Sequence, residues 1–170
     1  LEMVDIGGGF PVKYLDENID IPHTCAVITR SFNRLFGDGY ELVAEPGRMI
    51  VGDAVILVTK VISESVRQGK KWLYFDDGTY GSFMEVLLYQ MKFPFRTNTQ
   101  GPLNNYILAG PTCDSIDVFS RDDSGSVCTI PLPEMHLDNL LIAGSMGAYT
   151  FSESTRFNGF EPPKFVFIDD

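Results

Sequence analysis

The sequence predicts an α/β region followed by an all-β domain, because the pattern of strands, helices and turns changes near Gly52. Before that point, one amphipathic helix stands between two short apolar segments, each of which runs into a glycine-containing loop. After it, short apolar segments recur with turn signals between them, which is typical of a β sandwich or barrel. We therefore assign residues 1–52 to an α/β portion and residues 53–170 to a β domain, and leave open that the last residues return to the α/β side.

The α/β portion is expected to begin with a strand over residues 1–6, which runs into three glycines. A helix is expected over residues 23–36, where apolar side chains recur at helical spacing and Gly37 follows as a C-cap. A second strand is expected over residues 41–44. Strand, helix and strand in this order are the pattern of an α/β unit.

The β domain is expected to contain several short strands and one helical interruption over residues 83–91. The strand candidates are residues 54–62, 72–75, 106–109, 140–143 and 165–168. Turn signals rich in Gly, Pro, Asp and Ser separate them at residues 67–69, 100–102, 122–125 and 161–163.

The composition is that of a globular protein, with 170 residues, 44% hydrophobic residues, 21% charged residues and a net charge of −10. The negative charge argues against a nucleic-acid partner, because phosphate binding needs clustered Lys and Arg. No apolar run reaches about 18 residues, so no transmembrane helix and no membrane partner are expected. Three cysteines without framework spacing favour reduced thiols and a cytoplasmic location. Neither histidine has a partner at metal-ligand spacing, so we predict no metal site.

Two loops at strand ends carry candidate phosphate ligands. Gly7, Gly8 and Gly9 would let the backbone approach an anion and aim its amides at it, although a triple glycine alone is more often a tight turn. Arg48, three residues after Glu45 across a Pro-Gly turn, could pair with a phosphate. Glu45 could keep a pyridinium nitrogen protonated. The plainer interpretation of Glu45 and Arg48 is a surface ion pair.

Acidic residues and a thiol mark two further loops. Asp77, beside Asp76 at the end of an apolar run, could bind the far ammonium of a diamino acid, although such acids more often cap a helix or fill a turn. Cys113 and Asp114 follow a Gly-Pro turn, which places a thiol and a carboxylate where an amine and a proton could both be handled. The alternative for Cys113 is an inert buried residue.

Two aromatic residues near the C-terminus complete the candidates. Tyr149, if exposed, could donate a hydrogen bond to a phosphate, and Phe157 could form the wall of a pocket. The alternative is that both are core aromatics beside a turn.

The order and spacing of seven short segments indicate a resemblance to a known family. They are DIGGGFP (residues 5–11), EPGR (45–48), DGTYGSF (77–83), GPTCDSID (110–117), LPEMH (132–136), MGAYT (146–150) and FNGF (157–160). Together they resemble the C-terminal part of the fold-type III PLP-dependent amino-acid decarboxylases, and most closely the ornithine and lysine decarboxylases. The resemblance extends from residue 5 to about residue 168.

The resemblance implies an N-terminal PLP-binding (β/α)8 barrel, which residues 1–52 would complete, a C-terminal β domain, and a homodimer whose active sites are shared between subunits. It implies that the phosphate of PLP is held by Gly7, Gly8, Gly9, Arg48 and Tyr149. Glu45 would face the pyridine nitrogen of the cofactor.

The resemblance also assigns substrate residues. Asp77 would bind the distal amine together with Asp114 of the other subunit. Cys113, also from across the interface, would reprotonate the carbanion left by loss of CO2, and Phe157 would line the pocket. Cys-Asp-Ser at residues 113–115 resembles the ornithine or lysine type, whereas relatives acting on diaminopimelate have Cys-Glu-Ser. The implied reaction converts a small basic diamino acid, ornithine first, to a diamine such as putrescine and CO2 in polyamine biosynthesis.

A (β/α)8 barrel takes about 250 residues, and only about two of its units fit before residue 50. The resemblance therefore places the rest of the barrel before Leu1, together with the lysine that binds PLP as a Schiff base and the histidine that stacks on it. We expect the chain alone to be inactive and to need this N-terminal barrel segment as its partner.

Two alternatives to the decarboxylase interpretation remain. One is a non-catalytic homologue that binds a protein partner and acts as a regulator, and the other is a stand-alone β module. Five candidate residues that a pseudoenzyme would not need argue against the first: Glu45, Arg48, Asp77, Cys113 and Asp114. The α/β character of the first 50 residues argues against the second.

Overall fold

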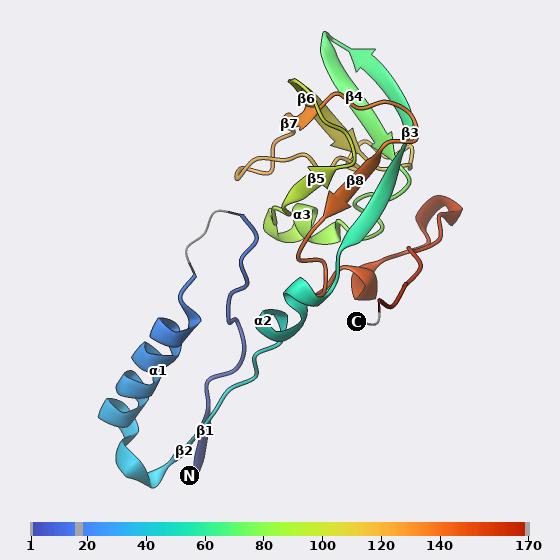
Figure 1. Cartoon of the computed structure of the whole chain (residues 1–170). Helices are drawn as coiled ribbons and strands as arrows, with labels where there is room; N and C mark the ends of the chain where they lie inside the picture. The colour runs from blue at the N-terminus through green and yellow to red at the C-terminus, as the bar shows by residue number, and fades with distance from the viewer. Residues whose placement is uncertain (1, 16–18, 169–170) are drawn as a thin grey trace.

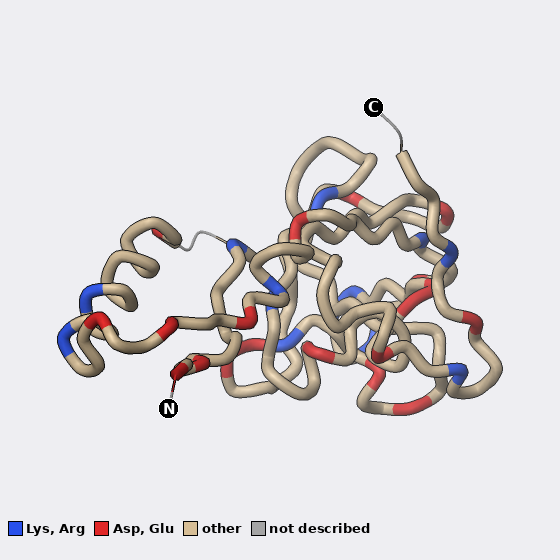
Figure 2. Tube along the Cα trace, turned by 90° about the horizontal axis from the view of Figure 1, so that it is seen from below, with Lys and Arg blue, Asp and Glu red and all other residues tan. Residues whose placement is uncertain are grey.

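The computed structural model describes residues 2–15 and 19–168, and it divides into a narrow arm and a larger sheet lobe (Figure 1). The arm is built from β1 (Met3–Asp5), α1 (Ile21–Phe36) and β2 (Glu41–Val43). The short helix α2 (Arg48–Val51) lies where the arm meets the lobe. Figure 2 shows the same division from below, with acidic and basic residues interspersed over both parts.

Strands β1 and β2 lie side by side in the arm as a parallel pair, with Val4 opposite Leu42 at its centre. Helix α1 forms the crossover between them, so the arm is a βαβ unit. The two strands predicted over residues 1–6 and 41–44 are present but shorter, and Leu1 lies outside the described residues.

Helix α1 is delimited by capping residues at both ends. The Oδ1 atom of Asp20 accepts a hydrogen bond from the backbone N–H of His23 at 2.8 Å, and Pro22 occupies the first turn. Gly37 ends the helix with a φ of 69°, a conformation that glycine adopts without steric cost. The predicted helix over residues 23–36 is therefore confirmed, with a start two residues earlier.

The lobe is built on a six-stranded sheet in the order β5-β8-β3-β4-β6-β7. These strands are β3 (Leu57–Arg67), β4 (Lys70–Phe75), β5 (Phe95–Thr97), β6 (Leu103–Ala109), β7 (Ile130–Pro133) and β8 (Leu140–Ala143). Neighbours are antiparallel except β4 and β6, which are parallel. The end strands β5 and β7 approach each other, so the sheet is nearly closed. The predicted β domain is thus confirmed in kind, whereas a complete (β/α)8 barrel is not part of the described chain.

Strand β3, with 11 residues, is the longest strand of the sheet and pairs with both β8 and β4. Leu57, Thr59 and Val61 are buried and alternate with outward-facing residues, so one face of the strand points into the core. Its first half pairs with β8 and its second half with β4. The hairpin to β4 turns at Gln68 and Gly69, which have φ values of 52° and 74°, as a two-residue turn between twisted strands requires.

Aromatic rings fill the core of the lobe. Phe83 stacks on Phe119 with ring centroids 4.3 Å apart, and Phe75 lies 5.6 Å from the same ring. Helix α3 (Met84–Tyr89) follows directly and confirms the helical segment predicted over residues 83–91. The same helix also buries the carboxylate of Glu85, which needs a partner there.

The strand predicted over residues 165–168 is wrong. These residues form no strand, and the side chains of Val166 and Phe167 are 83% and 87% exposed. Aromatic and β-branched residues favour a strand, but a strand needs a neighbour to pair with, and within residues 2–15 and 19–168 none pairs here. Strands β5 and β7 were not expected from the sequence.

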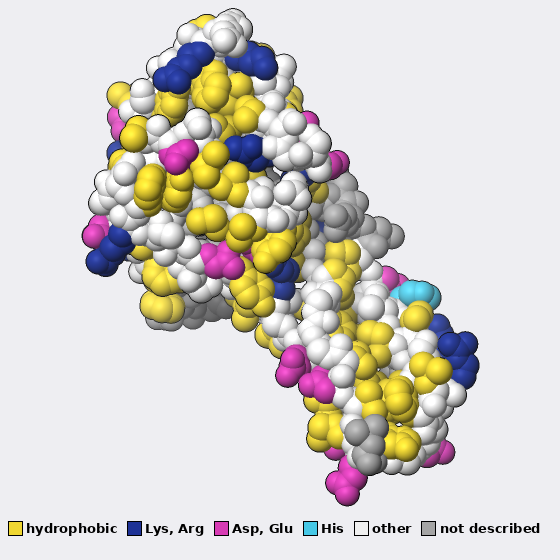
Figure 3. All heavy atoms as spheres, turned by 180° about the vertical axis from the view of Figure 1, so that it is seen from behind, with side chains coloured by type: hydrophobic (Ala, Val, Ile, Leu, Met, Phe, Trp, Pro, Cys, Tyr) yellow, Lys and Arg dark blue, Asp and Glu magenta, His cyan; other side chains and the backbone are white. Residues whose placement is uncertain are grey.

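Hydrophobic side chains remain on the outside of the arm, where Figure 3 shows them gathered along one face. Exposed members include Ile6, Val27, Leu35, Phe36 and Tyr40. An exposed apolar surface of this kind is typical of an interaction site. None of the helices in the described residues is long and apolar enough to cross a membrane.

Candidate active site

A pocket of about 620 Å³ lies at the junction of the arm and the lobe. Its lining includes Gly8, Gly9, Glu45, Arg48 and Tyr149. These residues come from three segments that are far apart in the sequence. The fold therefore brings to one pocket five of the six residues that were predicted to hold a cofactor, and Gly7 is adjacent to them in the chain.

The glycine loop after β1 is shaped by its contact with the loop after β2. The carbonyl of Gly7 accepts the backbone N–H of Glu45 at 2.9 Å, and a side chain at Gly8 would place its Cβ 2.8 Å from the carbonyl oxygen of Glu45. Gly7 and Gly9 have φ values of 71° and 82°, which favour glycine. The Glu45 side chain itself is exposed. This loop has the close-packed, Cβ-free backbone that an anion cradle needs.

Arg48 opens helix α2 and is held from several sides. Its Nη1 donates to Oε2 of Glu85 at 2.8 Å, its Nη2 donates to Oε1 of Glu85, and Nη1 also donates to the hydroxyl of Tyr14. The guanidinium carbon lies 4.8 Å from the ring centroid of Tyr149. The hydrogen bond to Glu85 is the main cause that raises the pKa of Arg48, and burial is the main cause that raises the pKa of Tyr14.

Glu85 and Tyr14 are site residues that the sequence reasoning missed. The Glu85 side chain is 1% exposed and sits in the otherwise apolar helix α3. A single acid among six residues that read Met-Glu-Val-Leu-Leu-Tyr was the available signal, because a buried carboxylate requires a cation. Its partner could not be read from the sequence, since Arg48 lies 37 positions earlier.

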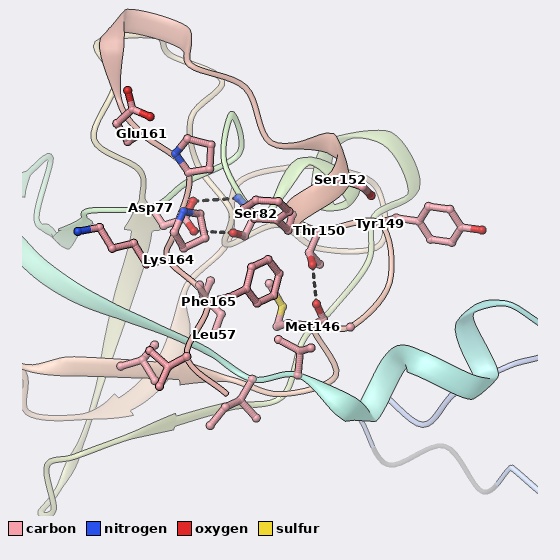
Figure 4. Close-up of a pocket in the computed structure, with 18 of the residues that line it drawn as sticks. Leu57, Asp77, Ser82, Met146, Tyr149, Thr150, Ser152, Glu161, Lys164 and Phe165 are labelled. Carbon is pink, nitrogen blue, oxygen red and sulfur yellow. Dashed lines mark hydrogen bonds between the residues drawn. The ribbon is translucent and has the colours of Figure 1, made fainter. Parts of the chain in front are cut away.

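Asp77 lies at a second place, at the end of β4, and its carboxylate is buried. Its Oδ1 accepts the backbone N–H groups of Gly78 at 2.7 Å and Ser82 at 2.9 Å, and its Oδ2 accepts the hydroxyl of Ser82 at 2.6 Å. Figure 4 shows the hydrogen bonds between Asp77 and Ser82. Burial is the main cause that raises the pKa of Asp77 above its usual value. The neighbouring Asp76 instead accepts the hydroxyl of Thr59 and the backbone N–H of Lys60.

Asp114 faces Tyr80, which is a further residue that the sequence reasoning did not single out. The Tyr80 hydroxyl donates to Oδ2 of Asp114 at 2.7 Å, and Oδ1 of Asp114 accepts the backbone N–H of Ile116 at 3.0 Å. The Ile116 N–H first, and the Tyr80 hydroxyl second, lower the pKa of Asp114. The same hydrogen bond raises the pKa of Tyr80 to about 12. The Tyr80 ring stacks on Phe157 at 4.1 Å.

Cys113 is exposed, so it is not the inert buried residue of the alternative interpretation. The side-chain amide of Asn158 donates to its Sγ at 3.5 Å. Asn158 has a φ of 55°, in the left-handed region that Asn tolerates better than most residues. Phe157 and Asn158 thus bring one segment against both the thiol of Cys113 and the tyrosine that contacts Asp114.

Cys113 and Asp114 lie apart from the residues that were predicted to hold the cofactor. Asp77 and Tyr149 both line a cavity of about 780 Å³ that lies beneath residues 161–168 (Figure 4). Cys113 and Asp114 line neither this cavity nor the 620 Å³ pocket that contains Arg48. Cofactor candidates and the thiol–carboxylate pair therefore occupy separate places on one chain.

The residues around the 620 Å³ pocket fit PLP by their chemistry. Backbone amides in a glycine loop, a guanidinium and a phenol are donors for a phosphate, and a carboxylate beside them can accept a bond from a protonated ring nitrogen. No group of three or more His, Cys, Asp or Glu side chains in the described ranges is arranged to hold a metal ion.

Comparisons with known proteins show the family of this chain. A family model described as "Pyridoxal-dependent decarboxylase, C-terminal sheet domain" matches residues 14–147. Lysine/ornithine decarboxylase of Selenomonas ruminantium is 36% identical over 168 residues, which cover 98% of this chain and 41% of that protein. Antizyme inhibitor 2 of Xenopus laevis is 32% identical over 178 residues, which cover 94% of this chain and 37% of that protein.

Among solved structures, the lysine/ornithine decarboxylase of Vibrio vulnificus complexed with cadaverine matches with a TM-score of 0.84 and 39% sequence identity. That match covers 95% of this chain and 42% of the other. The chain thus spans about two fifths of the length of these relatives. It belongs to the pyridoxal-dependent decarboxylases, in the family of the ornithine and lysine decarboxylases, and residues 14–147 match the C-terminal sheet domain of that family.

Proposed function

We propose that this chain is the C-terminal part of a PLP-dependent decarboxylase that converts a basic diamino acid, ornithine first and lysine second, to a diamine and CO2. The observation that carries the proposal is the convergence of the glycine loop, Glu45, Arg48 and Tyr149 on one pocket of about 620 Å³. In this proposal residues 1–52 complete the barrel, residues 53–170 form the β domain, and the enzyme works in the cytoplasm.

The cofactor residues act by binding and orientation. PLP, when bound, supplies an electron sink for the pair of electrons released as the bond to the carboxylate breaks. The backbone amides at Gly7, Gly8 and Gly9 and the guanidinium of Arg48 bind its phosphate, and the Tyr149 hydroxyl adds a hydrogen bond. The exposed carboxylate of Glu45 accepts a hydrogen bond from the ring nitrogen and keeps it protonated, which strengthens the electron sink.

The substrate residues bind the distal ammonium of the diamino acid and donate a proton to its Cα atom. Asp77 and Asp114 bind the distal ammonium, and Phe157 provides an apolar wall for the methylene chain. The thiol of Cys113 donates its proton to the Cα atom after CO2 has left, and solvent reprotonates the thiolate. The Ile116 N–H first, and the Tyr80 hydroxyl second, lower the pKa of Asp114, which favours the ionised carboxylate that ammonium binding requires.

Two subunits share each active site in this proposal. Support comes from the separation on one chain, since Cys113 and Asp114 do not line the pocket that contains Glu45 and Arg48. A partner subunit in a two-fold dimer would present its own Cys113 and Asp114 to that pocket.

Co-expression of two full-length variants tests the shared site. Glu45→Ala and Cys113→Ala are each expected to lose activity as pure homodimers. If each site draws on both chains, random association restores about a quarter of the wild-type activity, because half of the dimers are mixed and each mixed dimer has one intact site. CO2 release from labelled ornithine is the readout. Activity that stays absent in the mixed preparation would place both residues of a site in one chain and contradict the proposal.

The substrate class is tested by kinetics of the full-length protein. Ornithine, lysine and diaminopimelate are compared as substrates, and Asp114→Ala is expected to raise KM for the preferred diamino acid at least tenfold, since an ammonium loses its charged partner. An unchanged KM would remove Asp114 from the substrate site.

A non-catalytic regulator is the second candidate function. The observation that favours it is the 32% identity to antizyme inhibitor 2. It predicts that the full-length protein neither binds PLP nor releases CO2 from any diamino acid. Binding of PLP together with CO2 release excludes it.

A further inference from the structure

Glu85 is a buried carboxylate whose charge is balanced by one cation, Arg48, from another part of the chain. It lies in helix α3 of the sheet lobe, and its side chain is 1% exposed. Arg48, at the junction with the arm, donates to both of its oxygens. A carboxylate so far out of water is costly unless it is paired in good geometry, and a bidentate guanidinium provides that geometry.

The donors of Arg48 can be counted. A guanidinium has five N–H groups in one plane. One N–H of Nη1 and one N–H of Nη2 reach Glu85, and the second N–H of Nη1 reaches Tyr14. The N–H of Nε and the second N–H of Nη2 are left, and within the described residues neither has an acceptor. These two bonds are parallel along one edge, which is the fork that matches two oxygens of a phosphate.

Two aromatic rings also lie close to the guanidinium. The ring of Tyr149 lies 4.8 Å from the guanidinium carbon, and the ring of Tyr14 lies 5.8 Å from it. Glu85, Tyr14 and Tyr149 together leave Arg48 little freedom to rotate, although its side chain lines the pocket and is 21% exposed. Its open edge therefore has one direction rather than many.

We propose that Glu85 is a positioning residue, which fixes Arg48 through the Nη1–Nη2 edge of the guanidinium so that the adjacent edge, formed by Nε and Nη2, receives the cofactor phosphate. The inference rests on the proposed function and adds to it that a residue of the sheet lobe sets phosphate affinity at the arm. It also couples the two parts, because the ion pair crosses the junction between them.

If Glu85 competed with the phosphate instead of positioning Arg48, its removal would change the phosphate affinity in the opposite direction. If Glu85 competed with the phosphate for Arg48, then removing its charge would free the arginine and tighten cofactor binding. If Glu85 positions Arg48, then removing or shifting the carboxylate lets the guanidinium turn, and the phosphate loses its paired donors. The direction of the change in phosphate affinity separates the two roles.

The experiment measures binding of PLP and of pyridoxal, which lacks the phosphate, to the full-length apoprotein by absorbance titration. Glu85→Gln removes the charge, Glu85→Asp keeps the charge but withdraws it by one methylene, and Glu41→Gln is the matched exposed control. We expect both Glu85 variants to weaken PLP binding roughly tenfold with pyridoxal binding unchanged, because only the phosphate uses Arg48. Glu41→Gln is expected to change neither.

Each other result has a defined meaning. Wild-type protein that does not bind PLP overturns the proposed function and this inference with it. Wild-type protein that binds PLP, with Glu85 variants that bind it equally or more tightly, overturns the positioning role alone. An equal loss for PLP and pyridoxal shows a general structural effect and likewise overturns it. If Glu85→Gln does not fold, Glu85→Asp decides, since it keeps a negative charge near Arg48 and shifts only its position.

Discussion

Asp117 accepts two hydrogen bonds from Thr112 at a single carboxylate oxygen. Its Oδ2 accepts the backbone N–H of Thr112 at 3.0 Å and the Thr112 hydroxyl at 2.7 Å. The other oxygen, Oδ1, accepts the backbone N–H and hydroxyl of Thr79 at 2.7 and 3.0 Å. The carboxylate is 2% exposed, so four donors replace its water. One buried acid thus joins the loop that carries Cys113 to the loop after Asp77.

Asp117→Asn is expected to destabilise this junction by about 2–3 kcal/mol, because each carboxylate oxygen faces a backbone N–H. Whichever way the amide lies, its NH2 group meets a donor that cannot reverse. Native-state hydrogen exchange of the segments around Thr79 and Thr112 measures the loss. Asp122→Asn is the matched control, since Asp122 accepts all three of its hydrogen bonds at one oxygen and an amide oxygen can take them over. Equal exchange in both variants would contradict the argument.

Asp77→Asn is expected to behave differently, although Asp77 is also buried. Its Oδ1 faces two backbone N–H groups, but its Oδ2 faces only the hydroxyl of Ser82, which can turn and accept a hydrogen bond. The amide therefore fits, and it removes a carboxylate whose pKa is raised by burial. We expect the variant to fold, and to be more resistant to urea than the wild type at neutral pH.

The pH dependence gives the sign of this effect. A folded-state pKa above the unfolded value means that the contribution of Asp77 to stability is present below the ordinary pKa of 3.8 and is lost as the pH rises through the raised value. Urea midpoints of the full-length wild type and Asp77→Asn should therefore diverge as the pH rises from about 4 to 7. Parallel curves over that range would show that the carboxylate is not penalised by burial.

Gly147→Ala is expected to disturb the contact that places Arg48 beside Tyr149. The backbone N–H of Gly147 donates to the carbonyl of Gly52 at 2.9 Å, and an added Cβ would overlap the carbonyl of Val51. The segment after helix α2 must move away, so we expect a loss of about 2–4 kcal/mol and weaker PLP binding. Thermal unfolding and PLP titration of the full-length protein measure both changes.

Gly39→Ala provides the control for that substitution. Gly39 has no positive φ, and no atom lies within 4 Å of its added Cβ. It should leave both stability and PLP binding close to the wild type. If Gly147→Ala is equally harmless, then the close approach of the two segments does not determine the site.

Local signals explain which elements the sequence predicted. Helix α1 was found because apolar side chains recur at helical spacing and Gly37 marks its end, whereas Asp20 and Pro22 were not used and the predicted start was two residues late. Strand β7 was missed because Pro131 and Pro133 argue against a strand, and they are tolerated there because β7 lies at the end of the sheet. The strand expected over residues 165–168 was wrong because its composition indicates a need for burial but does not supply a pairing partner.

The candidate site divides in the same way. Gly8, Glu45 and Arg48 were singled out because each stands in a short motif, and the fold brings them to one pocket. Glu85 and Tyr80 were missed because their roles arise from pairing with residues 37 and 34 positions away. Such pairs depend on sheet topology and on loop packing, which periodicity and turn signals do not specify.

Tyr80→Phe tests the pairing between Tyr80 and Asp114 directly. The variant keeps the ring that stacks on Phe157 at 4.1 Å and removes only the hydroxyl that donates to Oδ2 of Asp114. Because one carboxylate oxygen loses its orienting donor, we expect KM for ornithine to rise roughly three- to tenfold in the full-length enzyme while kcat stays near the wild-type value. The pKa of Asp114 should rise only towards its ordinary value of 3.8, so the carboxylate stays ionised and the rise in KM should be constant between about pH 5 and pH 8.

Steady-state kinetics from about pH 5 to pH 8 separate this role from a structural one. Tyr89→Phe is the control, since Tyr89 is 63% exposed and makes no hydrogen bond through its hydroxyl within the described residues. A fall in kcat with unchanged KM would place the Tyr80 hydroxyl in proton transfer rather than in orienting Asp114. An unchanged KM and kcat would show that the Ile116 N–H alone suffices to hold the carboxylate, because it is the larger of the two causes that lower its pKa.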